Sequence, residues 1–522
     1  MNILLLYPEF PDTYLSFKHA LKFIQKKATI PPLGLLTVAA MLPSEWEKRL
    51  VDLNVRKLTD EDLAWADYAF IGAMVVQKES ARQVISRCKQ ADVTVVAGGP
   101  LFTIEHEQFQ SVDHFVLNEA EITLRPFLAD LAQGCAKHIY TTTELADVQK
   151  TPVPLWELAD LSRYGSMSIQ FARGCPFHCD FCNVTALFGH RTRMKTTEQI
   201  IAELDKFSQL GWRDNIFFVD DNFIGNKGYL KSTLLPALIR WQKEKGPTPF
   251  NTQVSINLAD DEDLMHMMVE AGFDTVFIGI ETPDKNSLAE CSKIQNKNRD
   301  LVEDVRHIQR VGLQVQGGFI VGFDSDMPSI FQRQIEFIQE SGIVTVTVSM
   351  LQAPPGSKLY HRLKLENRLV GKMSWNHIDS ITNIVPVMGI DTLRAGYRNI
   401  VRHIYSPEHY YQRIKTFLMG YKKPKIETPL NSTHIGALFR SFYHLGIAGK
   451  ERIQYWKLLL WICFHRPYSF ALAVRLAIYG HHFRKISELY ILRESDITSK
   501  NFPEKCLLTL RTFYLSFIGK IS

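Results

Sequence analysis

Two stretches of the chain alternate apolar runs with amphipathic segments, and each predicts a parallel β-sheet covered by helices. In the first stretch, uncharged apolar runs at residues 2–7, 68–76, 93–97 and 114–117 are typical of strands buried on both faces. Helical periodicity follows two prolines over residues 33–42 and recurs over 79–90. The pattern predicts a doubly wound α/β domain over residues 1–139, with ligands at the carboxyl ends of its strands.

The second stretch repeats the alternation six times, at 167–171, 215–219, 252–256, 275–280, 314–321 and 345–351. Helical patterns at 197–210, 261–271 and 299–311 separate several of these strands. Six βα units predict a partial or complete parallel barrel over residues 165–365, with its site at the carboxyl ends of the strands. Residues 140–164 do not show this alternation of strands and helices. They carry Pro152, Pro154 and a run of threonines, so we expect a linker there.

Beyond residue 366 the alternation stops, and aromatic-rich helical patterns such as 393–404 and 453–464 predict a mostly helical region over 366–522. This region carries 23 Lys or Arg against 10 Asp or Glu, whereas the rest of the chain carries 37 against 45. The basic bias fits either a solvated helix face or contact with an anionic partner such as a membrane surface. The net charge of the whole chain, +5, is too small to predict a nucleic-acid partner, and we expect none.

Targeting and membrane signals are weak. The first apolar run lacks a basic flank and is too short for a signal peptide. Lys457, Arg466 and Arg475 interrupt the apolar segments near the C-terminus, so none reaches the roughly 18 to 20 uncharged residues of a spanning helix. We therefore expect a cytoplasmic protein, with peripheral attachment to the inner face of the membrane as the open alternative. Eight cysteines in 522 residues do not suggest a disulfide framework.

Three of those cysteines lie within eight positions, directly after the first strand of the predicted barrel. Cys175, Cys179 and Cys182 are separated by four and three residues, a spacing that lets three thiolates converge on one metal centre. Three ligands on a four-iron cube would leave one iron open to a substrate. The alternative is a zinc knuckle that takes His178 or His190 as its fourth ligand.

The string C-x-x-x-C-x-x-C, with Phe181 before its last cysteine, resembles the signature of the radical S-adenosylmethionine (SAM) superfamily. The resemblance implies that the three cysteines hold a 4Fe-4S cluster and that SAM chelates its open iron. It also implies that reductive cleavage of SAM yields a 5′-deoxyadenosyl radical, which removes hydrogen from an unactivated carbon. A flavodoxin or ferredoxin is the implied reductant.

Later strand ends resemble the SAM-binding positions of that superfamily. Asp221 follows the second strand at the place of the usual Gly-Gly-Glu, Ser255 ends the third, Glu281 matches the ribose-contacting position, and Ile320 matches the adenine contact. Two structural alternatives stay open: Asp220 or Asp221 can cap the next helix, and the glycine-rich segment at 317–323 can be only a strand and turn.

The first domain resembles the Rossmann-like cobalamin-binding domains that precede some radical SAM barrels. The matching residues are Pro31 to Gly34, Asp52, Gly72 to Gln77, Gly98, Gly99 and Glu119. The D-x-H-x-x-G string that supplies a cobalt-ligating histidine in many cobalamin proteins is missing, so we expect cobalamin without a protein histidine on cobalt, its lower face near 74–77 and Gln77 approaching the metal. A flavodoxin-like domain is the alternative.

The whole chain, including residues 382–386 and the basic aromatic tail, is similar to the hopanoid C-2 methylase group. With both cofactors, the resemblance implies a C-methyltransferase for an unactivated carbon of a small hydrophobic molecule, such as a hopanoid or another lipid. Trp456, Trp461 and Phe464 beside Lys and Arg fit a membrane interface, although an internal helical core is the alternative. A cobalamin-dependent radical SAM cyclase or rearrangement enzyme and a non-catalytic redox sensor stay open, and no residue is assigned to catalysis itself.

Overall fold

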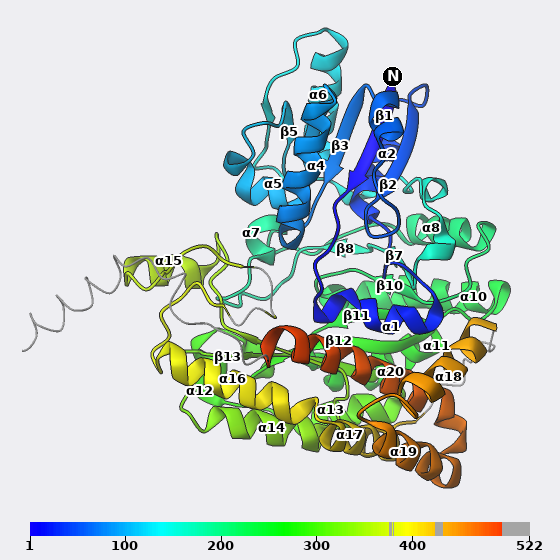
Figure 1. The fold of residues 1–522 in the computed structure, drawn as a ribbon, viewed down its shortest axis with the longest axis vertical. Coiled ribbons are helices and arrows are strands. Elements are labelled where there is room, and N and C mark those ends of the chain that lie inside the picture. The colour runs from blue at the N-terminus through cyan, green and yellow to red at the C-terminus, as the bar shows by residue number, and fades with distance from the viewer. Residues whose placement is uncertain (375–377, 379–380, 423–431, 493–522) are drawn as a thin grey trace, which may run out of the picture.

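The computed structural model describes residues 1–374, 378, 381–422 and 432–492. Figure 1 shows a parallel sheet at one end of the long axis of the molecule, and a second sheet with the C-terminal helices at the other end. The α/β architecture with a helical C-terminal region is therefore confirmed.

The front sheet is wholly parallel, with the strand order β2-β1-β3-β4-β5-β6. Side chains that alternate along β1 feed two separate cores, one beneath α2 and α6 and the other beneath α3, α4 and α5. Burial on both faces explains why most of these strands are continuous apolar runs. The strands are β1 (Asn2–Tyr7), β2 (Glu47–Asp52), β3 (Tyr68–Gly72), β4 (Thr94–Gly98), β5 (His114–Val116) and β6 (Ile139–Tyr140), and the helices are α1 (Lys18–Leu21), α2 (Leu33–Met41), α3 (Asp60–Trp65), α4 (Lys78–Gln90), α5 (Pro100–Glu105) and α6 (Ala120–Ala132).

Two strands of this sheet are absent from the sequence-based pattern. β2 is an edge strand that begins with Glu47, Lys48 and Arg49, and its first four residues are exposed or half-buried, so it has no continuous apolar run. β6 has only two residues and lies at the start of the predicted linker. The charges of β2 protect this edge of the sheet from pairing with other chains and hide the strand from hydrophobic pattern analysis, whereas β6 is too short to show a pattern.

The second sheet has six parallel strands in purely sequential order, β7-β10-β11-β12-β13-β14, as expected for an open (β/α)6 barrel. An antiparallel pair, β8 with β9, is inserted after β7 and flanks the cysteine loop. The strands are β7 (Met167–Ile169), β8 (Ala172–Arg173), β9 (Arg193–Met194), β10 (Ile216–Phe218), β11 (Phe250–Val254), β12 (Phe273–Glu281), β13 (Gln314–Val321) and β14 (Val346–Met350), and the helices are α7 (Val184–Phe188), α8 (Thr197–Gln209), α9 (Lys227–Tyr229), α10 (Leu235–Lys245), α11 (Glu262–Glu270), α12 (Lys285–Glu290), α13 (Leu301–Val311), α14 (Ile330–Ser341) and α15 (Lys358–Leu365).

The C-terminal helices share one hydrophobic core with the barrel. Residues between β1 and α2 join the same core: the Tyr14 hydroxyl lies 2.8 Å from Ser487 Oγ, and Arg440 Nε donates to the carbonyl oxygen of Phe23 at 2.9 Å. Among the described residues, none of the helices combines the length and the apolar character needed to cross a bilayer. The helices are α16 (Ile390–Ile404), α17 (Pro407–Gly420), α18 (Ser432–His444), α19 (Arg452–His465) and α20 (Phe470–Ile486).

Candidate functional site

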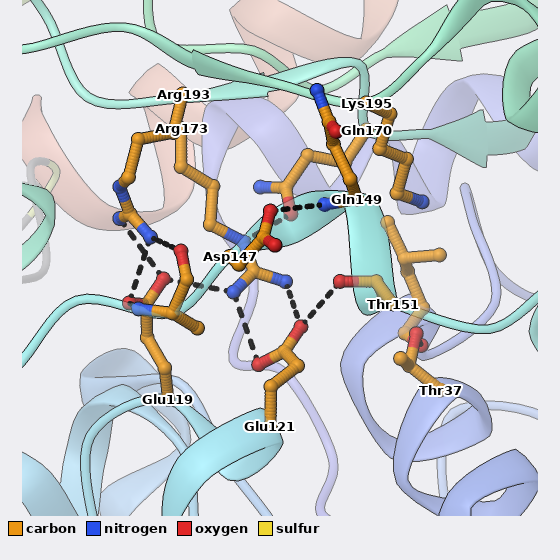
Figure 2. Close-up of polar contacts among 12 residues, drawn as sticks. Thr37, Glu119, Glu121, Asp147, Gln149, Thr151, Gln170, Arg173, Arg193 and Lys195 are labelled. Atoms are coloured by element: carbon orange, nitrogen blue, oxygen red, sulfur yellow. Dashed lines mark hydrogen bonds and ion pairs between the residues drawn. The ribbon is translucent and has the colours of Figure 1, made fainter.

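Two arginines of the barrel and two glutamates of the front domain join the carboxyl edges of the two sheets (Figure 2). Arg173, just past β7, donates to Glu119 at 2.8 Å and to Glu121 at 2.7 Å. Arg193 donates to Glu119 at 2.9 Å. The two glutamates follow β5, so the ligand-binding edge of the front sheet faces the ligand-binding edge of the barrel.

The barrel needs this contact for electrostatic reasons. Arg173 and Arg193 are directly opposite each other in the β8–β9 pair, where like charges destabilise. Glu119 and Glu121 neutralise them, and the glutamate side chains are only 4% and 9% exposed. Burial raises the pKa of Glu121, but hydrogen bonds and charge from Arg173 outweigh it and hold that pKa below its ordinary value. Glu121 is therefore an ionised partner of Arg173, and the contacts of both glutamates hold the two domains together.

The cysteine loop begins directly after Arg173, which takes part in the contact between the two domains. Gly174 has a φ of +92°, and a Cβ there would meet the carbonyl oxygen of Arg191 at 2.6 Å, so only glycine fits the turn. The loop is held at its middle, because the Asp180 N–H donates to the carbonyl oxygen of Cys291 at 3.0 Å and the Asp180 carbonyl accepts from Leu359 N at 2.9 Å. Cys175, Cys179 and Cys182 are all half-buried.

Burial makes the thiols of Cys175 and Cys182 dependent on a bound metal for ionisation. Burial raises the pKa of the Cys182 thiol to about 12, so a thiolate there needs a metal cation to stabilise it. Within the ranges that the structure describes, no three His, Cys, Asp or Glu side chains gather closely enough to hold one metal ion. A four-iron cluster instead spreads its ligands over different irons. The rings of His178 and His190 pack against each other, 4.1 Å between centroids, on the exposed side of the loop.

Lys293 is a residue at this site that the sequence analysis missed. It follows α12, its side chain is 12% exposed, and its Nζ donates to Glu281 at 2.7 Å. It also lies over the ring of Phe181 at 5.9 Å, and the charges of Glu281, Cys179 and Cys182 together raise its pKa although burial lowers it. This cation therefore sits between the cysteine loop and the carboxyl end of β12. No motif surrounds it in the sequence, so only the fold reveals it.

Asp221 lies beside the cysteine loop. Burial raises its pKa to about 6, while a hydrogen bond from the Gly174 N–H and the charge of Arg173 act in the opposite direction. Asp220 is fully buried and accepts from the Ala172 N–H, so it ties β10 to β8 rather than capping a helix. Of the two carboxylates, Asp221 is the one that faces the loop, as the SAM-binding prediction requires, although its role stays a prediction.

The other predicted SAM positions also end neighbouring barrel strands. Ser255 Oγ donates to Asn257 Oδ1 at 2.6 Å, and its N–H donates to Asn222 at 3.2 Å. Glu281 has a φ of +65°, a strained conformation for a side chain of this size that often accompanies functional sites. Ile320 packs in a small apolar cluster together with Phe181 of the cysteine loop. The fold thus brings Asp221, Glu281 and Ile320 to the same edge as the cysteines.

The predicted cobalamin positions divide into two groups. The first is explained by the chain itself: a Cβ on Gly98 would meet the carbonyl oxygen of Val116 at 2.7 Å, one on Gly99 would approach Ala73 at 3.3 Å, and Gln77 is 1% exposed with its amide bound to Pro8 and Met74. Glu119 also belongs to this first group, because its carboxylate pairs with Arg173 and Arg193.

The second group is not explained by internal packing. A Cβ on Gly34, in the first turn of α2, would meet nothing within 4 Å, and Met74 is 45% exposed just after β3. Both lie near the point between β1 and β3 where the strand order reverses, the usual crevice for a ligand in such a sheet. His114 begins β5 and His138 precedes β6, so both lie toward the opposite edge. These positions fit a flat ligand bound without a histidine.

Comparison with known proteins agrees with this geometry. A family model described as "Radical SAM superfamily" matches residues 169–338, and one described as "Domain of unknown function (DUF4070)" matches residues 357–495. The barrel is therefore a radical SAM domain, and a 4Fe-4S cluster and SAM are its implied cofactors.

Two relatives with similar sequences over most of their length show which family the chain belongs to. The hopanoid C-2 methylase of Rhodopseudomonas palustris is 33% identical over 474 residues, which cover 88% of this chain and 89% of the relative. An uncharacterized methyltransferase of Synechocystis, sll1242, is 38% identical over 94% of this chain and 92% of its own length. Within the superfamily, the chain belongs to the methyltransferase family that includes the hopanoid C-2 methylase.

Solved structures share the fold at low identity. The cobalamin-dependent SAM radical enzyme OxsB, solved with aqua-cobalamin, superposes with a TM-score of 0.60 at 15% identity and covers 93% of this chain and 79% of its own. The radical SAM methyltransferase TsrM from Kitasatospora setae, solved with cobalamin and a [4Fe-4S] cluster, gives 0.53 at 15% identity, with coverages of 70% and 78%. The likeness confirms the fold.

Proposed function

We propose that the protein is a cobalamin-dependent radical SAM C-methyltransferase, which acts in the cytoplasm on an unactivated carbon of a hopanoid or similar lipid. The observation that carries the proposal is the opposition of the two carboxyl edges across the Arg173–Glu121 contact. A methyl donor on the front edge and a hydrogen-abstracting group on the barrel edge would share one substrate there. The name of the hopanoid C-2 methylase relative supports the substrate class.

The cofactors, when bound, would supply the reaction itself. For each methyl group transferred, the balance would be two SAM and two electrons from a flavodoxin or ferredoxin consumed, with methionine, 5′-deoxyadenosine and S-adenosylhomocysteine released beside the methylated product. The protein's own contribution is positioning. Cys175, Cys179 and Cys182 would hold the cluster, Lys293 would balance the negative charge of the thiolates, and Asp221 and Glu281 would orient SAM.

The test is isotope transfer under oxygen-free conditions. Reconstituted protein receives hydroxocobalamin, SAM with a deuterated methyl group, a flavodoxin reducing system, and a hopanoid without a methyl group at C-2, presented in detergent micelles. The expected result is a labelled methylhopanoid, with one 5′-deoxyadenosine and one S-adenosylhomocysteine for each product. Comparison of the lipids of cells with and without the protein checks the substrate in vivo.

Different outcomes identify the alternatives. If 5′-deoxyadenosine forms and the substrate is rearranged without label, the protein is a cyclase or rearrangement enzyme. If cluster and SAM are bound but no 5′-deoxyadenosine forms with any lipid fraction or reductant, the redox-sensor interpretation replaces the enzyme.

A further inference from the structure

Large exposed apolar side chains concentrate on the segment 432–468, which contains α18 and α19. The described residues include 23 such side chains, and this short segment holds nine of them, including five of the six aromatic ones. Scattered exposed apolar residues are ordinary, but a concentration of this kind marks an interaction surface. We call these nine residues the α18–α19 face: Ile435, Phe439, Tyr443, Ile447, Ile453, Trp456, Leu460, Phe464 and Tyr468.

The spacing of these residues places them on the outer side of each helix. Ile435, Phe439 and Tyr443 recur every four residues along α18. The exposed apolar residues of α19 recur every three or four residues, at 453, 456, 460 and 464. The opposite side of α19, which includes Leu458 and Ile462, is fully buried in the core. A helix that is apolar on both sides is normally covered on both sides. Within the described residues, the outer side of α19 is left exposed.

The two helices contribute to one surface. The ring of Phe442 stacks on Trp456 with 5.6 Å between centroids, and Phe439 contacts Phe442 at 6.3 Å. Trp456 Nε1 donates to the carbonyl oxygen of Gly446 at 2.9 Å, which fixes the indole at the turn between the helices. Figure 1 shows α18 and α19 at one corner of the molecule, at the far end from the front sheet.

The charges around the face are mostly positive, and among the described residues Lys450 is the one exposed cation there that pairs with an acid, Glu488 at 3.0 Å. The segment 432–468 contains five Lys or Arg and one acid, Glu451, which is 2% exposed and pairs with Arg484 and His481. Four of the five cations are exposed: Lys450, Arg452, Lys457 and Arg466. A second copy would present the same positive charge and be repelled, whereas an anionic lipid surface offers apolar depth and negative headgroups together.

We propose that the α18–α19 face docks the protein onto an anionic lipid bilayer. The aromatic and aliphatic side chains enter the boundary between headgroups and acyl chains, and the cations contact lipid phosphates. The docking surface stands on its own observations, and only its purpose, delivery of a membrane lipid to the barrel, rests on the proposed function. The core that α17, α19 and α20 share with the barrel links the face rigidly to the site.

The test is sedimentation of the full-length protein with vesicles of phosphatidylcholine, alone or mixed with phosphatidylglycerol. We expect binding to the mixed vesicles that weakens as salt increases. Phe464→Glu is expected to reduce binding about tenfold, since it removes a deeply inserting ring. Lys457→Gln is expected to reduce binding about fivefold, and only with phosphatidylglycerol present. Leu365→Glu is the matched control, because Leu365 is 85% exposed and Phe464 is 83% exposed.

Three results would overturn the proposal: no binding of the wild type to either vesicle, equal effects of Phe464→Glu and Leu365→Glu, or a wild-type dimer that Phe464→Glu dissociates without vesicle binding. Vesicle binding that appears only after removal of residues 493–522 would also overturn it, since that segment would then cover the face. The variants should keep SAM cleavage and label transfer in detergent micelles. Docking without any hopanoid labelling would leave this proposal standing and reject the proposed substrate.

Discussion

The two six-stranded sheets of this protein are both wholly parallel, but their strand orders create different kinds of site. The front sheet is ordered β2-β1-β3-β4-β5-β6, so its connections reverse once, between β1 and β3. The barrel is ordered sequentially from β7 to β14 and does not reverse. A reversal opens a single crevice at one strand pair, whereas a sequential curled sheet brings all its carboxyl ends around one centre.

This difference explains how the candidate residues are distributed. In the barrel, Cys175, Asp221, Glu281 and Ile320 come from four different strand ends and still meet at one edge. Among the predicted cobalamin positions, Gly34 and Met74, which lie close to the reversal, are not explained by internal packing. We therefore expect the site at the barrel edge to be built from many strand ends, and the site at the front edge to be built from a few loops.

The largest effect should come from the barrel edge. Cys179→Ala removes one of three thiolates, so we expect loss of the cluster and no detectable 5′-deoxyadenosine. Cobalamin bound at the front edge should be retained, because the two edges hold their ligands independently. Iron content, 5′-deoxyadenosine and the visible absorption of cobalamin measure these outcomes.

Cys463→Ala is the matched control, because Cys463 is an exposed thiol on α19 far from the loop in sequence and is expected to leave all three measurements unchanged. Persistent SAM cleavage in Cys179→Ala would reject the cluster assignment. Loss of cobalamin together with the cluster would show that the two edges are not independent.

The sequence predicted the barrel more completely than the front sheet. Parallel strands such as β12 and β13 carry apolar residues or glycine at most positions, and their predicted bounds differ from the observed ones by two residues or fewer. β2 was missed because Glu47, Lys48 and Arg49 place charge on an edge strand. The contact of Tyr14 with Ser487 joins residues 473 positions apart, which no local pattern can predict.

The junction between the edges should give the next largest effect. Glu121→Gln keeps the side-chain volume but removes one of the two charges that neutralise Arg173. Breaking a buried ion pair costs about 3–5 kcal/mol, so we expect unfolding free energy to fall by about 3 kcal/mol. If the edges shift by even about 1 Å, methyl transfer suffers far more than SAM cleavage. We expect methylated product per 5′-deoxyadenosine to fall about tenfold, measured by mass spectrometry.

The same carboxylate gives a pH dependence. The pKa of Glu121 is lower in the folded protein than in the unfolded chain, so its contribution is present above about pH 4.3 and is lost as the pH falls through the folded value. Glu121→Gln should lack this part of the acid sensitivity. Glu79→Gln is the control, since Glu79 is 77% exposed and pairs with Arg82, a contact worth about 0–1 kcal/mol. If the amount of methylated product per 5′-deoxyadenosine is the same in Glu121→Gln and Glu79→Gln, Glu121 does not position the two edges.

Glu119 and Lys293 show where sequence reasoning about the site stops. Glu119 was predicted from resemblance as a cobalamin position, and the fold engages its carboxylate with Arg173 and Arg193, which come from a distant part of the chain. Lys293 carries no motif, and its importance follows only from the approach of Glu281 and Phe181. Motifs identified the cysteines because their chemistry is local, but the residues that orient them depend on tertiary packing.

The smallest effect should come from the front edge. At Gly34, a substitution is expected to change protein stability and cobalamin affinity in opposite directions. Alanine in the first turn of α2 meets nothing within 4 Å and lowers backbone entropy in the unfolded chain, so Gly34→Ala should stabilise the protein by about 0.5–1 kcal/mol. If cobalamin lies against this turn, the added methyl should nevertheless weaken its binding, about tenfold by equilibrium titration. Gly228→Ala, on an exposed turn of α9, should leave cobalamin affinity unchanged. A Gly34→Ala variant that is more stable and binds cobalamin normally would move the ligand away from the reversal between β1 and β3, and the contrast between the two sheets would no longer explain their sites.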